Sequence, residues 1–159
     1  MTELNRLLQC LSDARIDFVI VGGFAAMLHG SSLLTRDLDV CAVLTAENLD
    51  KLRDVFRDLH PVHRMTPQRL SFLDSPDPGV PLSNLYLQTG LGPLQLLSTI
   101  TGVGDFERVR AGSIVVELFG KSTQVMSIED LIRARQALGR EKDWLAVKEL
   151  RAIIEKKPG

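Results

Sequence analysis

Residues 18–40, FVIVGGFAAMLHGSSLLTRDLDV, decide which fold this chain is expected to adopt. Phe18 to Val21 form a short continuous apolar run, which is typical of a central strand buried on both faces. Gly22-Gly23 ends that strand, and Phe24 to His29 has the length and composition of a short helix. Asp37 to Leu44 is expected to be a second strand. The stretch therefore predicts a strand, a helix and a strand in succession.

Two carboxylates stand at the start of the second expected strand, in Asp37-Leu38-Asp39. Residues i and i+2 of a strand project from the same face, so the two carboxylates are expected side by side while Leu38 enters the core. Adjacent hard oxygen ligands suit Mg²⁺, or Mn²⁺, completed by phosphate oxygens and water. Such a metal would bridge the phosphates of a nucleoside triphosphate and offset the charge that develops in phosphoryl transfer.

The Gly22-Gly23 pair supports the same chemistry. A turn without side chains lets a triphosphate approach the backbone N–H groups at the start of the following helix. Alone, each motif is common, and the alternative is a packing turn and a solvated strand end. Together, in the order strand, Gly-Gly, helix, strand, Asp-x-Asp, they favour a nucleotide site.

The middle of the chain continues the alternation of helices and strands. Leucines at helical spacing predict a first helix near residues 3–15, and Thr45 caps a later helix with an apolar stripe. Residues 61–82 hold five of the seven prolines, so long regular structure is not expected there. Further strands are expected around residues 84–88, 93–98, 113–119 and 122–126.

Two helices are expected at the C-terminal end. Ser127 followed by Asp130 is a capping signature for a helix that ends at Gly139. The helical spacing of the last segment predicts an apolar side made of Trp144, Leu145, Val147, Leu150 and Ile154.

The pattern as a whole predicts an α+β fold with a mixed sheet flanked by helices. We expect one domain over residues 1–159. A core with the sheet would span residues 1–126, and a helical pair residues 127–159.

Composition excludes several classes of protein. A net charge of −1 argues against a nucleic-acid binder that acts through bulk electrostatics. Two cysteines without a Cys-x-x-Cys pair favour a reducing compartment. No apolar stretch is long enough for a signal peptide or a membrane span, so we expect a cytoplasmic protein without a membrane partner.

The quoted stretch resembles the opening of the nucleotidyltransferase superfamily, which has the polymerase-beta-like fold, and of its small AbiEii-like, abortive-infection-type branch. The similarity continues through NLYLQTGLGPLQLLSTITGVGDF (84–106) and SIEDLIRARQALGREKDWLAVKELRAI (127–153). The resemblance implies a minimal nucleotidyltransferase fold and Mg²⁺-dependent transfer of a nucleotidyl group. It assigns the metal to Asp37 and Asp39 and the phosphate-facing turn to Gly22 and Gly23.

The resemblance also implies a phosphate-side role for basic residues of the last two helices. Arg135, Arg140 and Lys142 match the branch's Lys and R-x-K-D positions. Arg36 abuts the carboxylates and can reach a phosphate, but in a regular strand it would face away, so a surface role is equally open. Ser31 can hydrogen-bond phosphate, with a plain turn as the alternative.

One position departs from the family pattern. Family members place a third carboxylate on a neighbouring strand, and the equivalent residue here is Gln95. A carboxylate can ligate a second metal or take the proton of the attacking hydroxyl, whereas a Gln amide offers one oxygen to a metal and is no base at pH 7. Glu117 and Asp105 are conceivable substitutes, although the sequence places neither near Asp39.

These observations predict a Mg²⁺-dependent nucleotidyltransferase that moves a nucleoside monophosphate from a nucleoside triphosphate to a hydroxyl. The acceptor stays open between an RNA end, a protein side chain and a small molecule. The branch suggests a toxin–antitoxin or phage-defence setting and a partner chain encoded nearby. The alternative is a catalytically degraded module that binds a nucleotide or a partner, because Gln95 replaces the third carboxylate.

Overall fold

The computed structural model describes residues 3–65, 68–74 and 82–156. Seven strands form one mixed sheet in the order β3-β4-β5-β2-β1-β9-β8. They are β1 (Val19–Val21), β2 (Leu38–Cys41), β3 (Val62–His63), β4 (Asn84–Thr89), β5 (Gly92–Leu97), β8 (Ile114–Leu118) and β9 (Lys121–Val125). Two more strands, β6 (Thr99–Ile100) and β7 (Gly104–Asp105), pair in a separate hairpin.

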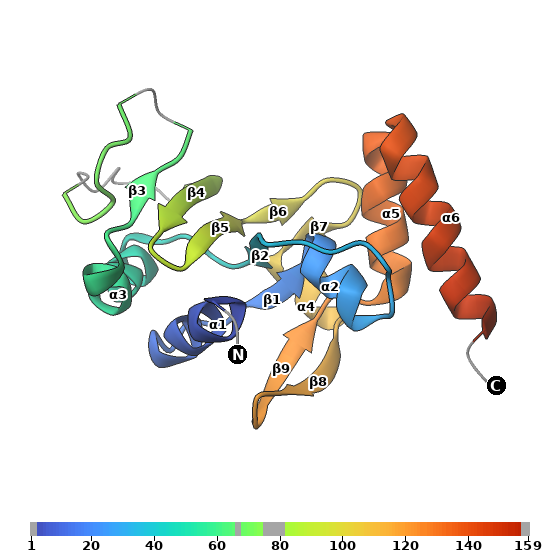
Figure 1. The fold of residues 1–159 in the computed structure, drawn as a ribbon, viewed down its shortest axis with the longest axis horizontal. Helices are drawn as coiled ribbons and strands as arrows, with labels where there is room; N and C mark the ends of the chain where they lie inside the picture. The colour runs from blue at the N-terminus through green and yellow to red at the C-terminus, as the bar shows by residue number, and fades with distance from the viewer. Residues whose placement is uncertain (1–2, 66–67, 75–81, 157–159) are drawn as a thin grey trace.

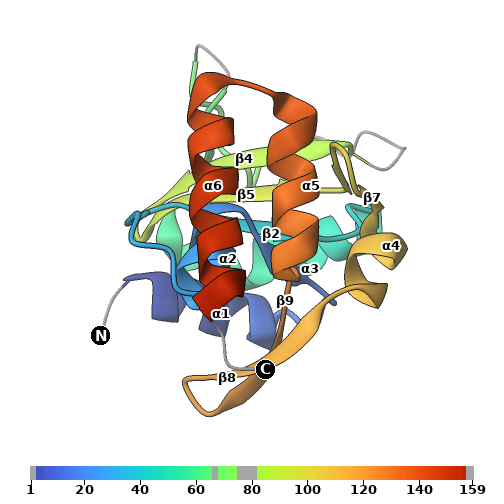
Figure 2. The same ribbon diagram turned by 90° about the vertical axis from the view of Figure 1, so that its right-hand side faces the viewer.

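Helices flank this sheet on both sides. They are α1 (Glu3–Asp13), α2 (Gly22–Leu28), α3 (Ala46–Phe56), α4 (Phe106–Ala111), α5 (Ile128–Leu138) and α6 (Glu141–Lys156), with a 3-10 turn at Arg57–Leu59. α1 and α3 lie near the β3 end of the molecule, and α5 and α6 lie side by side at its other end (Figure 1). Figure 2 shows α5 and α6 in front of the sheet. The mixed α/β architecture is the fold class that the sequence predicts.

Side chains alternate along β2, β4 and β5 between a core face and an open face. Leu38, Leu87 and Leu94 are fully buried and join one hydrophobic cluster with the apolar stripes of α1 and α3. Asp39 and Gln95, the residues that follow two of these leucines, remain partly exposed on the other face. The sheet therefore buries one surface and offers the other to a ligand.

Strand pairing aligns the polar residues of the open face. β1 runs antiparallel to β2 with Val21 opposite Asp39, and β2 runs parallel to β5 with Asp39 opposite Gln95. β4 runs antiparallel to β5 with Tyr86 opposite Gln95. Four adjacent strands thus place Val21, Asp39, Gln95 and Tyr86 in one row across the sheet.

The Gly22-Gly23 pair forms the first turn of α2, whereas the sequence predicts a turn ahead of a helix that starts at Phe24. Gly22 has φ of +67°, a left-handed conformation that only glycine adopts at little steric cost. A Cβ atom at Gly22 would lie 2.5 Å from Oδ2 of Asp39. Glycine is required here because the backbone passes directly over the Asp39 carboxylate.

The β6–β7 hairpin and α4 are not predicted by the sequence, because each is too short for its periodicity to be visible. Gly102 lies in the hairpin turn with φ of +85°. A Cβ atom there would lie 2.5 Å from Cβ of Ala137 and 2.8 Å from the carbonyl oxygen of Arg133. The backbone of the hairpin turn therefore packs directly against α5.

The prediction for the apolar side of α6 is right for Val147 and Leu150, which are buried, and wrong at three positions, since Ile154 is 39% exposed and two others are more so. Trp144 is 51% exposed and Leu145 is 64% exposed, while Asp143 is completely buried. Asp143 is buried because it accepts hydrogen bonds from the guanidinium groups of Arg135 and Arg140, at 2.9 and 2.6 Å respectively for the shortest contact of each. This ionic contact sets which side of α6 faces α5.

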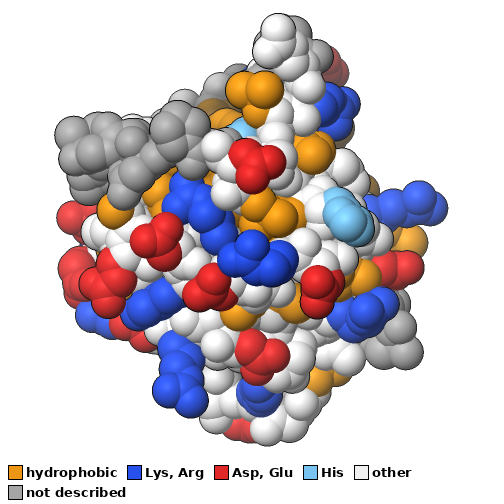
Figure 3. Space-filling view, turned by 90° about the vertical axis from the view of Figure 1, so that its left-hand side faces the viewer, with side chains coloured by type: hydrophobic (Ala, Val, Ile, Leu, Met, Phe, Trp, Pro, Cys, Tyr) orange, Lys and Arg blue, Asp and Glu red, His pale blue; other side chains and the backbone are white. Residues whose placement is uncertain are grey.

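Charged side chains of both signs are interspersed over the end of the molecule near α3 (Figure 3). Along α3 and the turn that follows it, Lys51, Arg53 and Arg57 each pair with an acidic residue three or four positions earlier. In the described part of the chain, no helix has the length and apolar character needed to cross a bilayer.

Candidate active site

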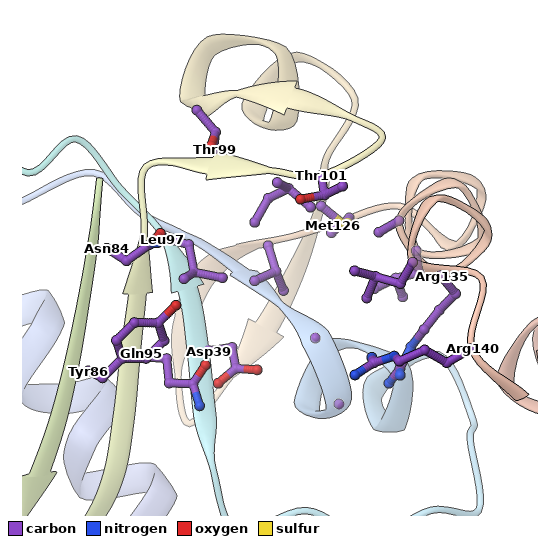
Figure 4. A pocket seen from close by; sticks show the side chains of 17 residues that line it. Asp39, Asn84, Tyr86, Gln95, Leu97, Thr99, Thr101, Met126, Arg135 and Arg140 are labelled. Atoms are coloured by element: carbon purple, nitrogen blue, oxygen red, sulfur yellow. The ribbon is translucent and has the colours of Figure 1, made fainter. Parts of the chain in front are cut away.

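Two cavities open on the polar side of the sheet and meet at Asp39. The first measures about 440 Å³ and the second about 420 Å³. Both are lined by Gly22, Gly23, Asp39 and Arg135. Figure 4 shows the first cavity, with Asp39, Gln95 and Tyr86 along one wall and Arg135 and Arg140 on the opposite side. A ligand in either cavity would contact the Asp39 region.

The two predicted metal ligands, Asp37 and Asp39, lie on the wall of the second cavity. β2 begins at Leu38, so Asp37 comes just before the strand, while Leu38 is fully buried as predicted. Asp37 acts electrostatically on Asp39, raising the pKa of Asp39. The structure therefore brings the two carboxylates together beside the start of α2.

The Asp39 carboxylate is poorly solvated and poorly compensated. Burial, followed by the negative charge of Asp37, raises the pKa of Asp39 to about 6, and the positive charges of Arg64 and Arg135 oppose that rise. Its Oδ1 atom is buried and has no hydrogen-bond partner among the described residues. A buried, unpartnered carboxylate oxygen is costly, and a bound cation is one means of satisfying it.

The donors present fit a Mg²⁺ or Mn²⁺ ion that keeps part of its shell from substrate and water. No group of three or more His, Cys, Asp or Glu residues gathers within the described ranges, so the chain itself supplies two carboxylates. Magnesium commonly binds through one or two carboxylates plus substrate phosphates. The partnerless Oδ1 of Asp39 and the adjacent Asp37 form such a donor pair.

Gln95 lies next to Asp39, at the position expected of the third carboxylate in the family. It is directly opposite Asp39 in the β2–β5 pair and lines the first cavity. The two conceivable substitutes are elsewhere: Glu117 accepts a hydrogen bond from Ser122 in the β8–β9 hairpin, and Asp105 caps α4. Neither lines either cavity.

The basic residues of the last two helices surround both cavities. Arg135 lines both, Arg140 lines the first, and Lys142 lines the second. Asp143 holds Arg135 and Arg140 in place, and hydrogen bonding from Arg140 keeps the pKa of Asp143 well below its usual range. Asp143 is not among the predicted site residues, although an acidic residue three positions after Arg140, in the first turn of the expected last helix, was a usable signal.

Ser31 and Arg36 are placed differently from the other predicted nucleotide-binding residues. Ser31 lines the second cavity, but its hydroxyl donates to Glu149 of α6 at 2.5 Å, which ties the loop after α2 to the C-terminal helix. Arg36 is exposed and lines a separate cavity beside Gln88 and Gly92. Arg36 therefore lines neither of the two cavities that meet at Asp39.

Comparison with known proteins supports the fold. No protein-family model and no curated protein matches the sequence. The lincosamide antibiotic adenylyltransferase LnuA, in its lincomycin-bound crystal structure, superposes with a TM-score of 0.61 at 16% identity, covering 95% of this chain and 96% of that chain. An antigenic nucleotidyltransferase-like protein from Paracoccidioides brasiliensis gives 0.58 at 19% identity, covering 98% of this chain and 75% of the other.

A third solved structure is ANT(2'')-Ia in complex with adenylyl-2''-tobramycin. Its TM-score is 0.50 at 16% identity, with 95% of this chain and 98% of that chain covered. Identities this low support the architecture alone. The chain has the nucleotidyltransferase fold.

Proposed function

We propose that this protein is a Mg²⁺-dependent nucleotidyltransferase that moves a nucleoside monophosphate from a nucleoside triphosphate to a hydroxyl. The observation that carries the proposal is the buried, unpartnered Oδ1 of Asp39, adjacent to Asp37 at the junction of two cavities. Nucleotidyl transfer needs a metal between a donor and an acceptor, and this junction supplies the donor atoms for one.

The second cavity suits the triphosphate. It alone contains Asp37 and Lys142, and it shares Gly22 and Arg135 with the first cavity. Lys142 and Arg135 supply positive charge for phosphate oxygens, and the first N–H groups of α2 lack intrahelical partners. When bound by Asp37 and Asp39, the metal would offset charge on the phosphoryl group in transfer.

The first cavity, on the Gln95 side, suits the acceptor. Transfer joins the acceptor oxygen to the α-phosphorus, breaks the bond between that phosphorus and the bridging oxygen, and releases pyrophosphate and the hydroxyl proton. Asp39 is the only acidic residue that lines this cavity within the described part of the chain. Gln95 is neutral and cannot take the proton, so we expect slow transfer.

A cavity of about 440 Å³ has the size of a small-molecule site. Two of the solved neighbours are described with antibiotics bound or modified, which supports a small-molecule acceptor over an RNA end or a protein side chain. The abortive-infection-type branch, with a toxin–antitoxin or phage-defence setting and a partner chain, is the finer proposal. Growth arrest of an expressing host by wild type but not by Asp39→Asn would support that setting, and equal growth would count against it.

One observation favours a second candidate. A neutral residue, Gln95, occupies the position next to Asp39. The protein would then bind a nucleotide at the Asp39 site without catalysing transfer. In this second candidate the metal and the triphosphate bind as described above, and binding of the nucleotide, not its transfer, controls what the module does with a partner.

A transfer assay separates the two candidates. Purified protein is incubated with Mg²⁺, each α-labelled ribonucleoside triphosphate and a small-molecule extract, and labelled products are resolved. Label transfer by wild type that Asp39→Asn abolishes supports the enzyme. Binding without transfer, with activity appearing in Gln95→Asp, supports the module. Absence of any thermal shift with Mg²⁺ and triphosphate, where about 2.7 kcal/mol is expected at a hundred times the dissociation constant, contradicts both.

A further inference from the structure

Arg64 extends the row of polar residues that contains Asp39. β3 pairs with β4 so that Val62 faces Gln88 and His63 faces Leu87, and the backbone N–H of Arg64 then donates to the carbonyl of Tyr86 at 2.9 Å. Tyr86 lies opposite Gln95, which lies opposite Asp39. Residues directly opposite on neighbouring strands share a face. Arg64 therefore belongs to the face that carries Asp39.

The neighbours of Arg64 agree with this orientation. His63, one position earlier, stacks edge-on with Phe72, whose side chain is buried in the core. Arg64 is half-buried. Its backbone is three strands from that of Asp39, about 14 Å at ordinary strand spacing. Its positive charge lowers the pKa of Asp39.

Arg64 differs from the other arginines at the site in having no ion-pair contact within the described part of the chain. Arg135 and Arg140 both pair with Asp143. Among the described residues, no hydrogen bond or ion pair engages the Arg64 guanidinium. A half-buried cation that shares the open face of the sheet with Asp39 and has no ion-pair partner is suited to an anionic ligand group.

The first cavity, which lies along the row between Tyr86 and Asp39, has matching chemistry. Tyr86 and Gln95 lie along its wall, with the Tyr86 ring available for a planar or apolar group (Figure 4). Asp39 is the single acidic residue of that wall within the described ranges, and it is assigned to the metal. A polycationic acceptor would find no further carboxylate there.

We propose that the acceptor is an anionic small molecule, and that Arg64 is the residue that selects it. The anionic group, a phosphate ester or a carboxylate, binds Arg64. The body of the acceptor packs on Tyr86, and its reacting hydroxyl lies over Gln95 beside Asp39. This inference rests on the proposed function, because it assigns the first cavity to the acceptor.

The test measures binding of matched probes in the presence of Mg²⁺ and saturating α,β-methylene ATP. The anionic probes are 4-nitrophenyl phosphate and 4-nitrobenzoate, and the neutral probe is 4-nitrophenyl β-D-glucoside. Wild type is expected to bind at least one anionic probe about tenfold tighter than the neutral probe, as a charge-assisted hydrogen bond allows. Arg64→Gln should lose that preference, and Arg64→Lys should keep part of it.

The matched control is Arg69→Gln, because Arg69 is an exposed arginine of the same segment. It should bind all probes as wild type does. Equal binding of neutral and anionic probes to wild type, or a preference that survives in Arg64→Gln, would overturn the proposal. So would binding of the anionic probe that is seen without α,β-methylene ATP and lost when the nucleotide saturates, since Arg64 would then bind the donor.

The Mg²⁺–triphosphate thermal shift is recorded for every variant. A normal shift in Arg64→Gln shows that this variant is folded and that its donor site is intact. Lack of the shift in wild type would refute the proposed function, while an Arg64-dependent preference for anionic probes would still stand as an anion site. The two failures are therefore distinguishable.

Discussion

Asp39→Asn is expected to make the metal-free protein more stable while removing its ability to bind Mg²⁺ and triphosphate. In the folded protein, burial and the charge of Asp37 raise the pKa of Asp39 to about 6 from an ordinary value of 3.8. At neutral pH the Asp39 carboxylate is ionised, and its ionisation destabilises the folded state. Asparagine has nearly the same shape without the charge.

The sign of the effect follows from proton binding. Between pH 3.8 and about 6 the folded state holds the Asp39 proton and the unfolded state releases it, so the free energy of unfolding falls as the pH rises through this window. Above about pH 7 the full penalty is present. A pKa difference of roughly two corresponds to about 3 kcal/mol. In a chain of this size, that is a gain in Tm of about 6–12 °C for the variant.

The assay is urea unfolding of wild type and Asp39→Asn at pH 4, 6 and 8 without metal. We expect equal stability near pH 4 and a difference of about 2–3 kcal/mol in favour of the variant at pH 8. Addition of Mg²⁺ and triphosphate should then stabilise wild type and leave the variant unchanged. Asp37→Asn is the matched control, because it removes the repulsion on Asp39 but not the burial, and it should give a smaller gain.

Two outcomes would refute this reasoning. A variant less stable than wild type at pH 8 would mean that the Asp39 carboxylate contributes to the fold. A stability difference that does not shrink toward pH 4 would mean that the charge is not its cause.

Three other outcomes are expected. Gly22→Ala should lose stability and triphosphate binding, whereas Gly120→Ala, also at positive φ but with nothing within 4 Å of its Cβ, should pay only the backbone cost of about 1–2 kcal/mol, as urea unfolding can show. Asp143→Asn should lower Tm by several degrees at pH 7, with a difference that disappears in acid, because the stabilisation from its lowered pKa is lost as the pH falls; thermal scans against pH check this. The affinity for Mg²⁺ and triphosphate should fall as the pH drops below about 6, where Asp39 protonates, and calorimetric titrations from pH 5 to 8 would contradict this if they were flat.

Much of the site could be predicted because its chemistry is encoded over short distances in the chain. Asp37 and Asp39 are two residues apart at the start of β2, so they line one cavity while Leu38 enters the core, and this needs no knowledge of other strands. The cap at Ser127 is equally local, since its hydroxyl accepts from the backbone N–H of Asp130. The side chain of Asp130, however, pairs with Arg108 from a helix that the sequence does not predict.

Local pattern is enough to predict the apolar strands, the Asp-x-Asp pair and the two C-terminal helices, because these depend on periodicity and on contacts between near neighbours. Three features could be seen only in the folded chain: Gln95 and Tyr86 lie in the row of Asp39, Arg64 belongs to the same row, and Asp143 is buried against two arginines. Strand order and register join segments far apart in the chain, and their energy comes from packing and pairing that no local pattern contains. That is the physical reason why the carboxylate pair was predictable and its surroundings were not.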